Sequence, residues 1–111
     1  MTEASVRIDK WLWFARMAKT RSLAARLCAA GGVTVGGAVV TKPHHPVRVG
    51  EAVTVVQGRL QRSLVVTALG ARRGPPAEAR LLYEEPVPPV RLSRSDPGWS
   101  PLLDEYEEGL T

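Results

Sequence analysis

The chain has few of the residues that cross-link a protein or anchor it in a membrane. Its 111 residues include one cysteine, Cys28, which excludes an internal disulfide and a cysteine-based zinc cluster and fits a reducing cytoplasm. No segment approaches the roughly 20 apolar residues of a membrane span. The charged start is not followed by an uninterrupted apolar segment, so we expect no signal peptide. These absences predict a cytoplasmic protein that does not bind membranes.

The sequence also lacks the residue combinations of an enzyme. It contains no pairing of a nucleophile with a base, no glycine-rich cofactor loop and no set of metal ligands. His44 and His45 are adjacent but have no third ligand at metal spacing. A single domain, for which about 100–150 residues is typical, leaves little room for a deep catalytic pocket. We therefore expect no catalytic residues, no cofactor and no metal.

The charge of the chain is unevenly distributed. Residues 1–80 contain thirteen Lys and Arg against four Asp and Glu, whereas residues 81–111 contain two against seven. The net charge of +4 thus hides a basic body that carries an acidic tail. Such a body is typical of a protein that binds a polyanion, and improved solubility is the alternative.

An apolar stripe at helical spacing predicts a first helix at about 9–18. Asp9 is expected either to be its N-cap or to form a salt bridge with a nearby arginine. Trp11 is expected in the core, whereas Trp13 either stacks on a base or ribose or covers the helix surface. The stripe and its flanks consist of Trp11, Leu12, Phe14, Ala15 and Ala18.

A second helix is predicted at 21–30. Thr20 is a natural N-cap, and Gly31-Gly32 ends the helix. Cys28 falls on the buried face with the leucines, so we expect a structural role for its thiol.

After these glycines the hydrophobic period changes from helical to β. Residues 33–40 predict a hairpin that turns at Gly36-Gly37. Two further strands are predicted at 52–57 and 63–69. The connecting segments are predicted as a frayed end at 1–6, a loop at 42–46, a polar turn at 58–62 with solvated Arg59 and Arg62, and a short helix or turn at 77–85.

The chain is expected to divide into a domain at 1–85 and a tail at 86–111. The tail is rich in proline and acidic residues, which predicts an extended and weakly ordered segment. It is expected to act as a solubilising tail or to fold back over the basic face.

Lys19, Thr20 and Arg21 form the most specific constellation. They occupy the corner between the predicted helices, where unpaired N–H groups at a helix N-terminus favour an anion. Two cations and the hydroxyls of Thr20 and Ser22 complete a site suited to phosphate. The side chains predicted to contact the polyanion are Arg7, Lys10, Arg16, Lys19, Thr20, Arg21, Ser22, Arg26 and Lys42.

Several motifs resemble the RNA-binding domain named after small-subunit ribosomal protein four, the S4 domain. They are R-I-D-K-W-L at 7–12, K-T-R at 19–21, Gly32-Val33, V-G-G at 35–37, Lys42-Pro43 and Gly50-Glu51. K-W-L-W at 10–13, together with R-R-G-P and E-A-R-L-L-Y-E-E between 72 and 85, is similar to the small ribosome-associated heat-shock members of that family. The hairpin turn usually reads Asn-Gly in the family, and the acidic tail replaces a basic helical extension.

The resemblance implies an α+β fold in which two N-terminal helices pack on a small, mostly antiparallel sheet of four to five strands. It implies that structured RNA is bound by both helices and by the hairpin edge at Gly36 and Gly37. The expected partners are large-subunit ribosomal RNA and peptidyl-tRNA during stress or stalled translation, with the protein acting as a monomer. DNA or free RNA binding and a protein-interaction adaptor are alternatives. RNA-modifying enzymes that carry this domain need a catalytic domain that is not evident here.

Overall fold

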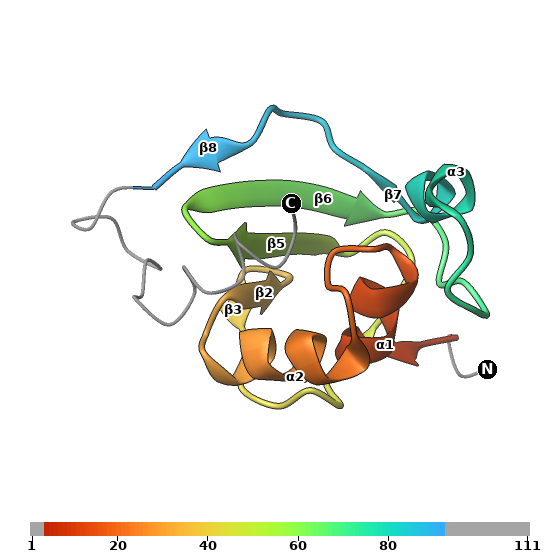
Figure 1. Ribbon diagram of the computed structural model, residues 1–111, viewed down its shortest axis with the longest axis horizontal. Coiled ribbons are helices and arrows are strands. Elements are labelled where there is room, and N and C mark those ends of the chain that lie inside the picture. Colours follow the sequence, from red (N-terminus) through yellow and green to blue (C-terminus); the bar gives the residue numbers. More distant parts are fainter. Residues whose placement is uncertain (1–3, 93–111) are drawn as a thin grey trace.

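The computed structural model describes residues 4–92 (Figure 1). Within this range the chain forms the predicted α+β fold, with an antiparallel main sheet ordered β3-β2-β5-β6-β7 and with β8 also paired to β6. This sheet has one strand more than expected because two short strands both pair with β6. Its strands are β2 (Val33–Val35), β3 (Ala38–Val39), β5 (Ala52–Gln57), β6 (Leu60–Val66), β7 (Tyr83–Glu84) and β8 (Val90–Arg91).

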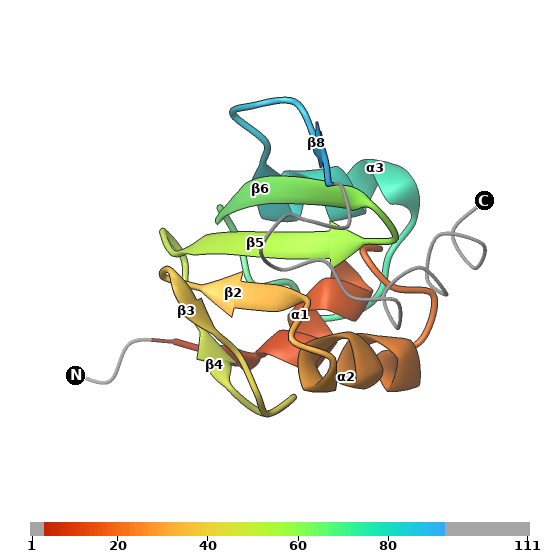
Figure 2. The same ribbon diagram turned by 90° about the vertical axis from the view of Figure 1, so that its left-hand side faces the viewer.

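The three α-helices lie in two places relative to the sheet. Helices α1 (Ile8–Phe14) and α2 (Arg21–Ala29) lie together beside β2, whereas α3 (Pro76–Ala79) lies near β6 and β7 (Figures 1 and 2). The sequence predicted both α1 and α2, and α3 begins the segment predicted as a short helix or turn. Four predicted contact residues lie within α1 and α2, namely Lys10, Arg21, Ser22 and Arg26.

Helix α1 begins at Ile8 because the preceding residues are paired as a strand. β1 (Val6–Arg7) runs antiparallel to β4 (Pro46–Val47). The prediction that Val6 belongs to a frayed end is therefore wrong. The extended Arg7 is the N-cap of α1, and Asp9 lies in the first turn. The prediction of Asp9 as the N-cap is therefore wrong.

Helix α1 ends at Phe14, four residues before the predicted end. The Met17 N–H donates to the Leu12 carbonyl at 2.8 Å and the Arg16 N–H donates to the Trp13 carbonyl at 3.2 Å. These two bonds form a Schellman motif, in which the residue at Arg16 takes a left-handed conformation with a φ of 61°. The apolar pattern in the sequence extends beyond Phe14 to Ala18, which is buried but not helical. The helix was therefore predicted to be longer than it is.

Helix α2 and the hairpin that follows it match the sequence prediction closely. The Thr20 Oγ1 accepts a hydrogen bond from the Leu23 N–H at 3.0 Å, which confirms the N-cap. Gly31, with a φ of 80°, ends the helix. Gly36 and Gly37 have φ values of 60° and 85°, so both take the left-handed conformation that the two-residue turn requires.

The second hairpin differs from its prediction. β5 and β6 are joined by the two residues Gly58 and Arg59, because Gln57 pairs with Leu60. β6 begins three residues earlier than predicted and ends at Val66. Its polar first half is half-exposed and resembled a turn in the sequence, although it is fully paired with β5.

The chain after β6 returns to the sheet twice. Helix α3 and a short 3-10 helix, η1 (Arg80–Leu82), lead into β7. Residues 86–92, which we grouped with the tail, contain β8 and place Leu92 in the core. Predictions for the rest of the tail fall on residues 93–111, outside the described part of the chain.

The core lies between the helices and the sheet. Trp11 is fully buried, as predicted, and its indole N–H donates to the Ala68 carbonyl at 3.0 Å. The buried Gln57 amide donates to the Met17 carbonyl at 2.6 Å and so fixes the connection between α1 and α2. Burial raises the pKa of the Cys28 thiol to about 12, which agrees with a structural role.

Candidate nucleic-acid interface

A buried carboxylate connects the starts of the two helices. The Asp9 side chain, 5% exposed, accepts two hydrogen bonds from Arg7, with N–O distances of 3.0 and 2.9 Å. The Arg21 Nη2 lies 3.5 Å from the same carboxylate. The salt-bridge interpretation of Asp9 is therefore confirmed. Two arginines share one acid, so the cluster keeps a net positive charge.

Both arginines remain able to bind an external anion. Their side chains are 47% exposed for Arg7 and 41% exposed for Arg21. A guanidinium has five N–H donors, and the contact with Asp9 occupies two of those of Arg7. The carboxylate therefore fixes the position of these groups and leaves donors directed to solvent.

The N-terminus of α2 lies beside this cluster. Thr20 caps one N–H group through its hydroxyl, while the other first-turn N–H groups of a helix have no partner within it. Lys19, Thr20 and Ser22 are exposed around this end. The predicted phosphate-binding corner is thus accessible.

The N-terminus of α1 differs because the segment after β3 covers it. The Ile8 N–H donates to the His45 carbonyl at 2.8 Å, and the Asp9 N–H donates to the Pro43 carbonyl at 3.2 Å. These carbonyls occupy the donors that an anion would need. The same contacts place the 42–45 segment, with the exposed Lys42, at the start of α1; Pro46, predicted as part of this loop, belongs to β4.

The structure thus brings together several of the predicted contact residues. We call this region the α1–α2 surface, and it comprises Arg7, Asp9, Lys10, Lys19, Thr20, Arg21, Ser22 and Lys42. Lys10 is half-buried, and its N–H donates to Asp9 at 2.8 Å. Arg26 is exposed one turn beyond Ser22 on the same face of α2.

The remaining predicted residues lie elsewhere. Gly36 and Gly37 are exposed at the hairpin turn, where the Gly36 N–H donates to the Ala52 carbonyl at 2.8 Å. Arg16 follows the far end of α1, and its Nε donates to the Gly74 carbonyl at 2.8 Å. Arg16 therefore belongs to a second basic region that includes Arg73, whose pKa is lowered by burial and by the charge of Arg16.

Arg62 was expected to be solvated, and this prediction is wrong. Its guanidinium forms a two-point contact with Glu85, with both N–O distances at 2.9 Å and both side chains 23% exposed. The hydrogen bonds of this pair raise the pKa of Arg62 and lower the pKa of Glu85. Arg62 lies in the polar first half of β6, between Gln61 and Ser63, so the local pattern gave no signal that it has a partner.

Trp13 covers the surface of the core. It is half-buried and its ring centroid lies 5.7 Å from that of Phe14. The guanidinium carbon of Arg73 lies 5.9 Å from the Trp13 ring, a distance typical of a cation–π contact. These contacts support the covering role, and base stacking by Trp13 stays a hypothesis.

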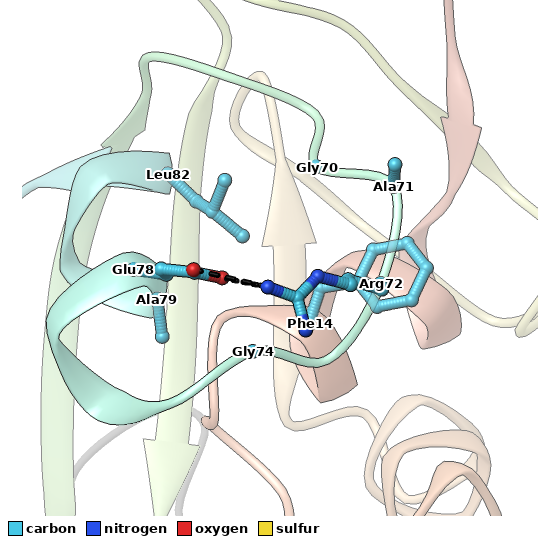
Figure 3. Close-up of a pocket in the computed structure, with 8 residues that line it drawn as sticks. All are labelled: Phe14, Gly70, Ala71, Arg72, Gly74, Glu78, Ala79 and Leu82. Carbon is cyan, nitrogen blue, oxygen red and sulfur yellow. Dashed lines mark hydrogen bonds and ion pairs between the residues drawn. The ribbon is translucent and has the colours of Figure 1, made fainter.

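An apolar cavity of about 200 Å³ lies under the 70–74 segment (Figure 3). Phe14 and Leu82 form apolar walls, and an exposed ion pair between Arg72 and Glu78, with an N–O distance of 3.0 Å, spans it. The carboxylate is thus held by an arginine and has no second acid or base beside it in the lining. Across residues 4–92 no three His, Cys, Asp or Glu side chains gather as metal ligands, and no helix is long and apolar enough to span a membrane.

Comparison with known proteins places the chain among a defined set of relatives. Residues 6–53 match the S4 domain. The chain is 44% identical over 80 residues to heat shock protein 15 of Escherichia coli K12, covering 72% of this chain and 59% of that protein. It is 37% identical over 102 residues to the heat shock protein 15 homolog of Haemophilus influenzae, covering 90% and 75%. The trimeric structure of Vibrio cholerae heat shock protein 15 matches with a TM-score of 0.69 and 38% identity, covering 74% of this chain and 82% of that one.

Proposed function

The chain belongs to the heat shock protein 15 family and contains an S4 domain, and on this premise we propose that it binds structured RNA through the α1–α2 surface. The observation that carries the proposal is the shared carboxylate of Asp9, which holds Arg7 and Arg21 beside the accessible N-terminus of α2. Such a cluster suits a phosphate group, because its N–H donors are fixed in position and its net charge is positive.

Binding would occur by docking onto the shape of the RNA. Lys and Arg neutralise phosphates, while the Thr20 and Ser22 hydroxyls and the α2 N–H groups set the register. A-form RNA is recognised mainly through its backbone and shape, so few contacts to base edges are expected. The exposed Gly36-Gly37 turn would let the hairpin backbone approach the RNA closely, as a separate contact.

The RNA is proposed to be large-subunit ribosomal RNA, together with peptidyl-tRNA when translation stalls under stress. The chain spans 59% of the length of the Escherichia coli relative, so functions of the whole relative that depend on its remaining part are not carried over. We propose that the protein is cytoplasmic and non-catalytic. We propose a monomer, and a trimer like that of the Vibrio cholerae protein is the alternative that light scattering would distinguish.

Sedimentation with purified large ribosomal subunits tests this proposal. The protein should co-sediment with subunits in a sucrose gradient, more so when they carry a stalled peptidyl-tRNA, and RNase treatment should release it. Crosslinks should map from Lys19 and Arg21 to ribosomal RNA. Co-sedimentation that survives RNase would favour a protein-interaction adaptor, and equal affinity for duplex DNA and RNA would remove the RNA preference.

A further inference from the structure

A second cavity, lined by basic side chains, lies at the opposite end of α1 from Asp9. Its volume is about 120 Å³, and its polar lining consists of Arg16, Arg62, Arg80 and Tyr83, which we call the arginine cavity. α1 has seven residues, which at about 1.5 Å per residue separates its ends by roughly 10 Å. The arginine cavity is therefore distinct from the α1–α2 surface.

The charges in the arginine cavity are incompletely balanced. Glu85 neutralises Arg62 through its two-point contact. Arg16 donates to a neutral carbonyl. The Arg80 backbone N–H caps α3, but within residues 4–92 the Arg80 side chain makes no hydrogen bond or ion pair. The charge of Arg73 also acts on Arg16 from close by. Like charges that gather around one cavity favour a bound anion that would relieve their repulsion.

The backbone at Arg16 supports a role for its side chain. Arg16 occupies the left-handed position of the Schellman motif, with a φ of 61°, where glycine is the usual residue. An L side chain at this position costs conformational energy. The Nε contact with the Gly74 carbonyl fixes the guanidinium, so its two terminal nitrogens are already oriented when an anion arrives.

We propose that the arginine cavity binds a phosphate group. Its volume exceeds the roughly 30 Å³ of one water molecule several times, which suits a tetrahedral oxyanion. Arginine and tyrosine supply planar forks and a hydroxyl donor, which match phosphate oxygens. The phosphate group comes from one of two sources. It belongs to RNA that is already held at the α1–α2 surface, in which case the inference rests on the proposed function, or it belongs to a small phosphorylated molecule.

Titration with inorganic pyrophosphate, followed by NMR of the arginine Nε–H groups, tests the cavity without RNA. The Arg16 and Arg80 signals should shift and saturate in the wild-type chain. Arg16→Gly and Arg80→Ala should each weaken this binding at least fivefold. Arg91→Ala is the matched control, because Arg91 is exposed on β8 and does not line the cavity, and its loss removes the same charge. Equal weakening by Arg91→Ala, or shifts that never saturate, would overturn the proposal.

Affinity for a labelled RNA hairpin at several salt concentrations then identifies the source of the phosphate. If RNA supplies it, Arg80→Ala should make the slope of log affinity against log salt shallower by about 0.9, the value of one phosphate contact. An unchanged slope together with lost pyrophosphate binding would assign the cavity to a small phosphorylated molecule. Failure of wild-type RNA binding would refute the proposed function and leave the pyrophosphate result intact, so the two failures can be told apart.

Discussion

The Asp9 carboxylate fixes the Arg7 guanidinium by a two-point contact, with N–O distances of 2.9 and 3.0 Å. Asp9 is buried, whereas nearly half of the Arg7 side chain is exposed. The contact therefore joins the interior of the protein to the surface on which we propose that RNA binds. It reduces the rotamer entropy that a long arginine side chain would otherwise lose on binding.

Replacing Asp9 by Asn should separate positioning from net charge. The Asp9→Asn variant keeps the side-chain size but removes the charge shared by Arg7 and Arg21, so the free energy of unfolding should fall by about 1–3 kcal/mol. RNA affinity should also fall, although the protein gains positive charge. Urea denaturation and fluorescence anisotropy measure the two effects. The control is Glu84→Gln, an exposed acid on β7, and a gain in affinity equal to that of the control would contradict the positioning role.

The N-cap of α2 offers a test of local stability. Thr20→Ala removes the acceptor of the Leu23 N–H and should lower the free energy of unfolding by about 1 kcal/mol. Thr20→Ser keeps an oxygen in the capping position and should restore most of that loss. Both values come from urea denaturation. Equal stability of the Ala and Ser variants would show that the cap has no energetic role.

The Arg62–Glu85 pair predicts a dependence of stability on pH. Hydrogen bonding to Arg62 lowers the pKa of Glu85 below its usual 4.5 in the folded protein. Glu85 therefore contributes stability above about pH 4.5, and this contribution is lost as the pH falls through the lower folded value. In Glu85→Gln the loss of stability in that acidic range should be smaller than in wild type. Thermal unfolding measured across this pH range should show a weaker pH dependence of stability for Glu85→Gln. The control variant Glu84→Gln should keep the pH dependence of wild type.

The left-handed residue after α1 predicts an unusual order of stabilities. Arg16→Gly relieves a conformational cost of about 1–2 kcal/mol and loses one hydrogen bond, so its stability should stay near that of wild type. Arg16→Ala loses the bond and keeps the cost, so it should be about 1 kcal/mol less stable than the glycine variant. Urea denaturation gives both values. An alanine variant as stable as the glycine variant would argue against a left-handed Arg16.

Local signals in the sequence were sufficient for some elements. The cap at Thr20 and the turn at Gly36-Gly37 depend on chemistry within a few residues, and both are confirmed. The resemblance to the S4 domain rested on motifs spread over 7–51, and the family match over residues 6–53 supports it.

Other features depend on contacts between distant segments, which the pattern of one segment cannot reveal. α1 stops early because Arg16 is left-handed and bonded to Gly74, 58 residues away in sequence. The start of β6 resembled a turn because its side chains are polar. The contact that holds Arg62 there comes from Glu85, 23 residues further along the chain. In the same way, the arginine cavity combines residues from the segment after α1 with residues from β6, α3, η1 and β7, so no single segment indicated it.

The salt dependence of RNA binding by Lys19→Ala/Arg21→Ala tests the central claim most directly. With about five phosphate contacts, log affinity of the wild-type protein should fall against log salt with a slope of roughly −4. Losing two contacts should bring the slope to roughly −2 and weaken binding at every salt concentration. Arg72→Ala/Arg91→Ala, which removes two exposed arginines outside the α1–α2 surface, should keep a slope near that of wild type. An unchanged slope and affinity in Lys19→Ala/Arg21→Ala would contradict binding at the α1–α2 surface.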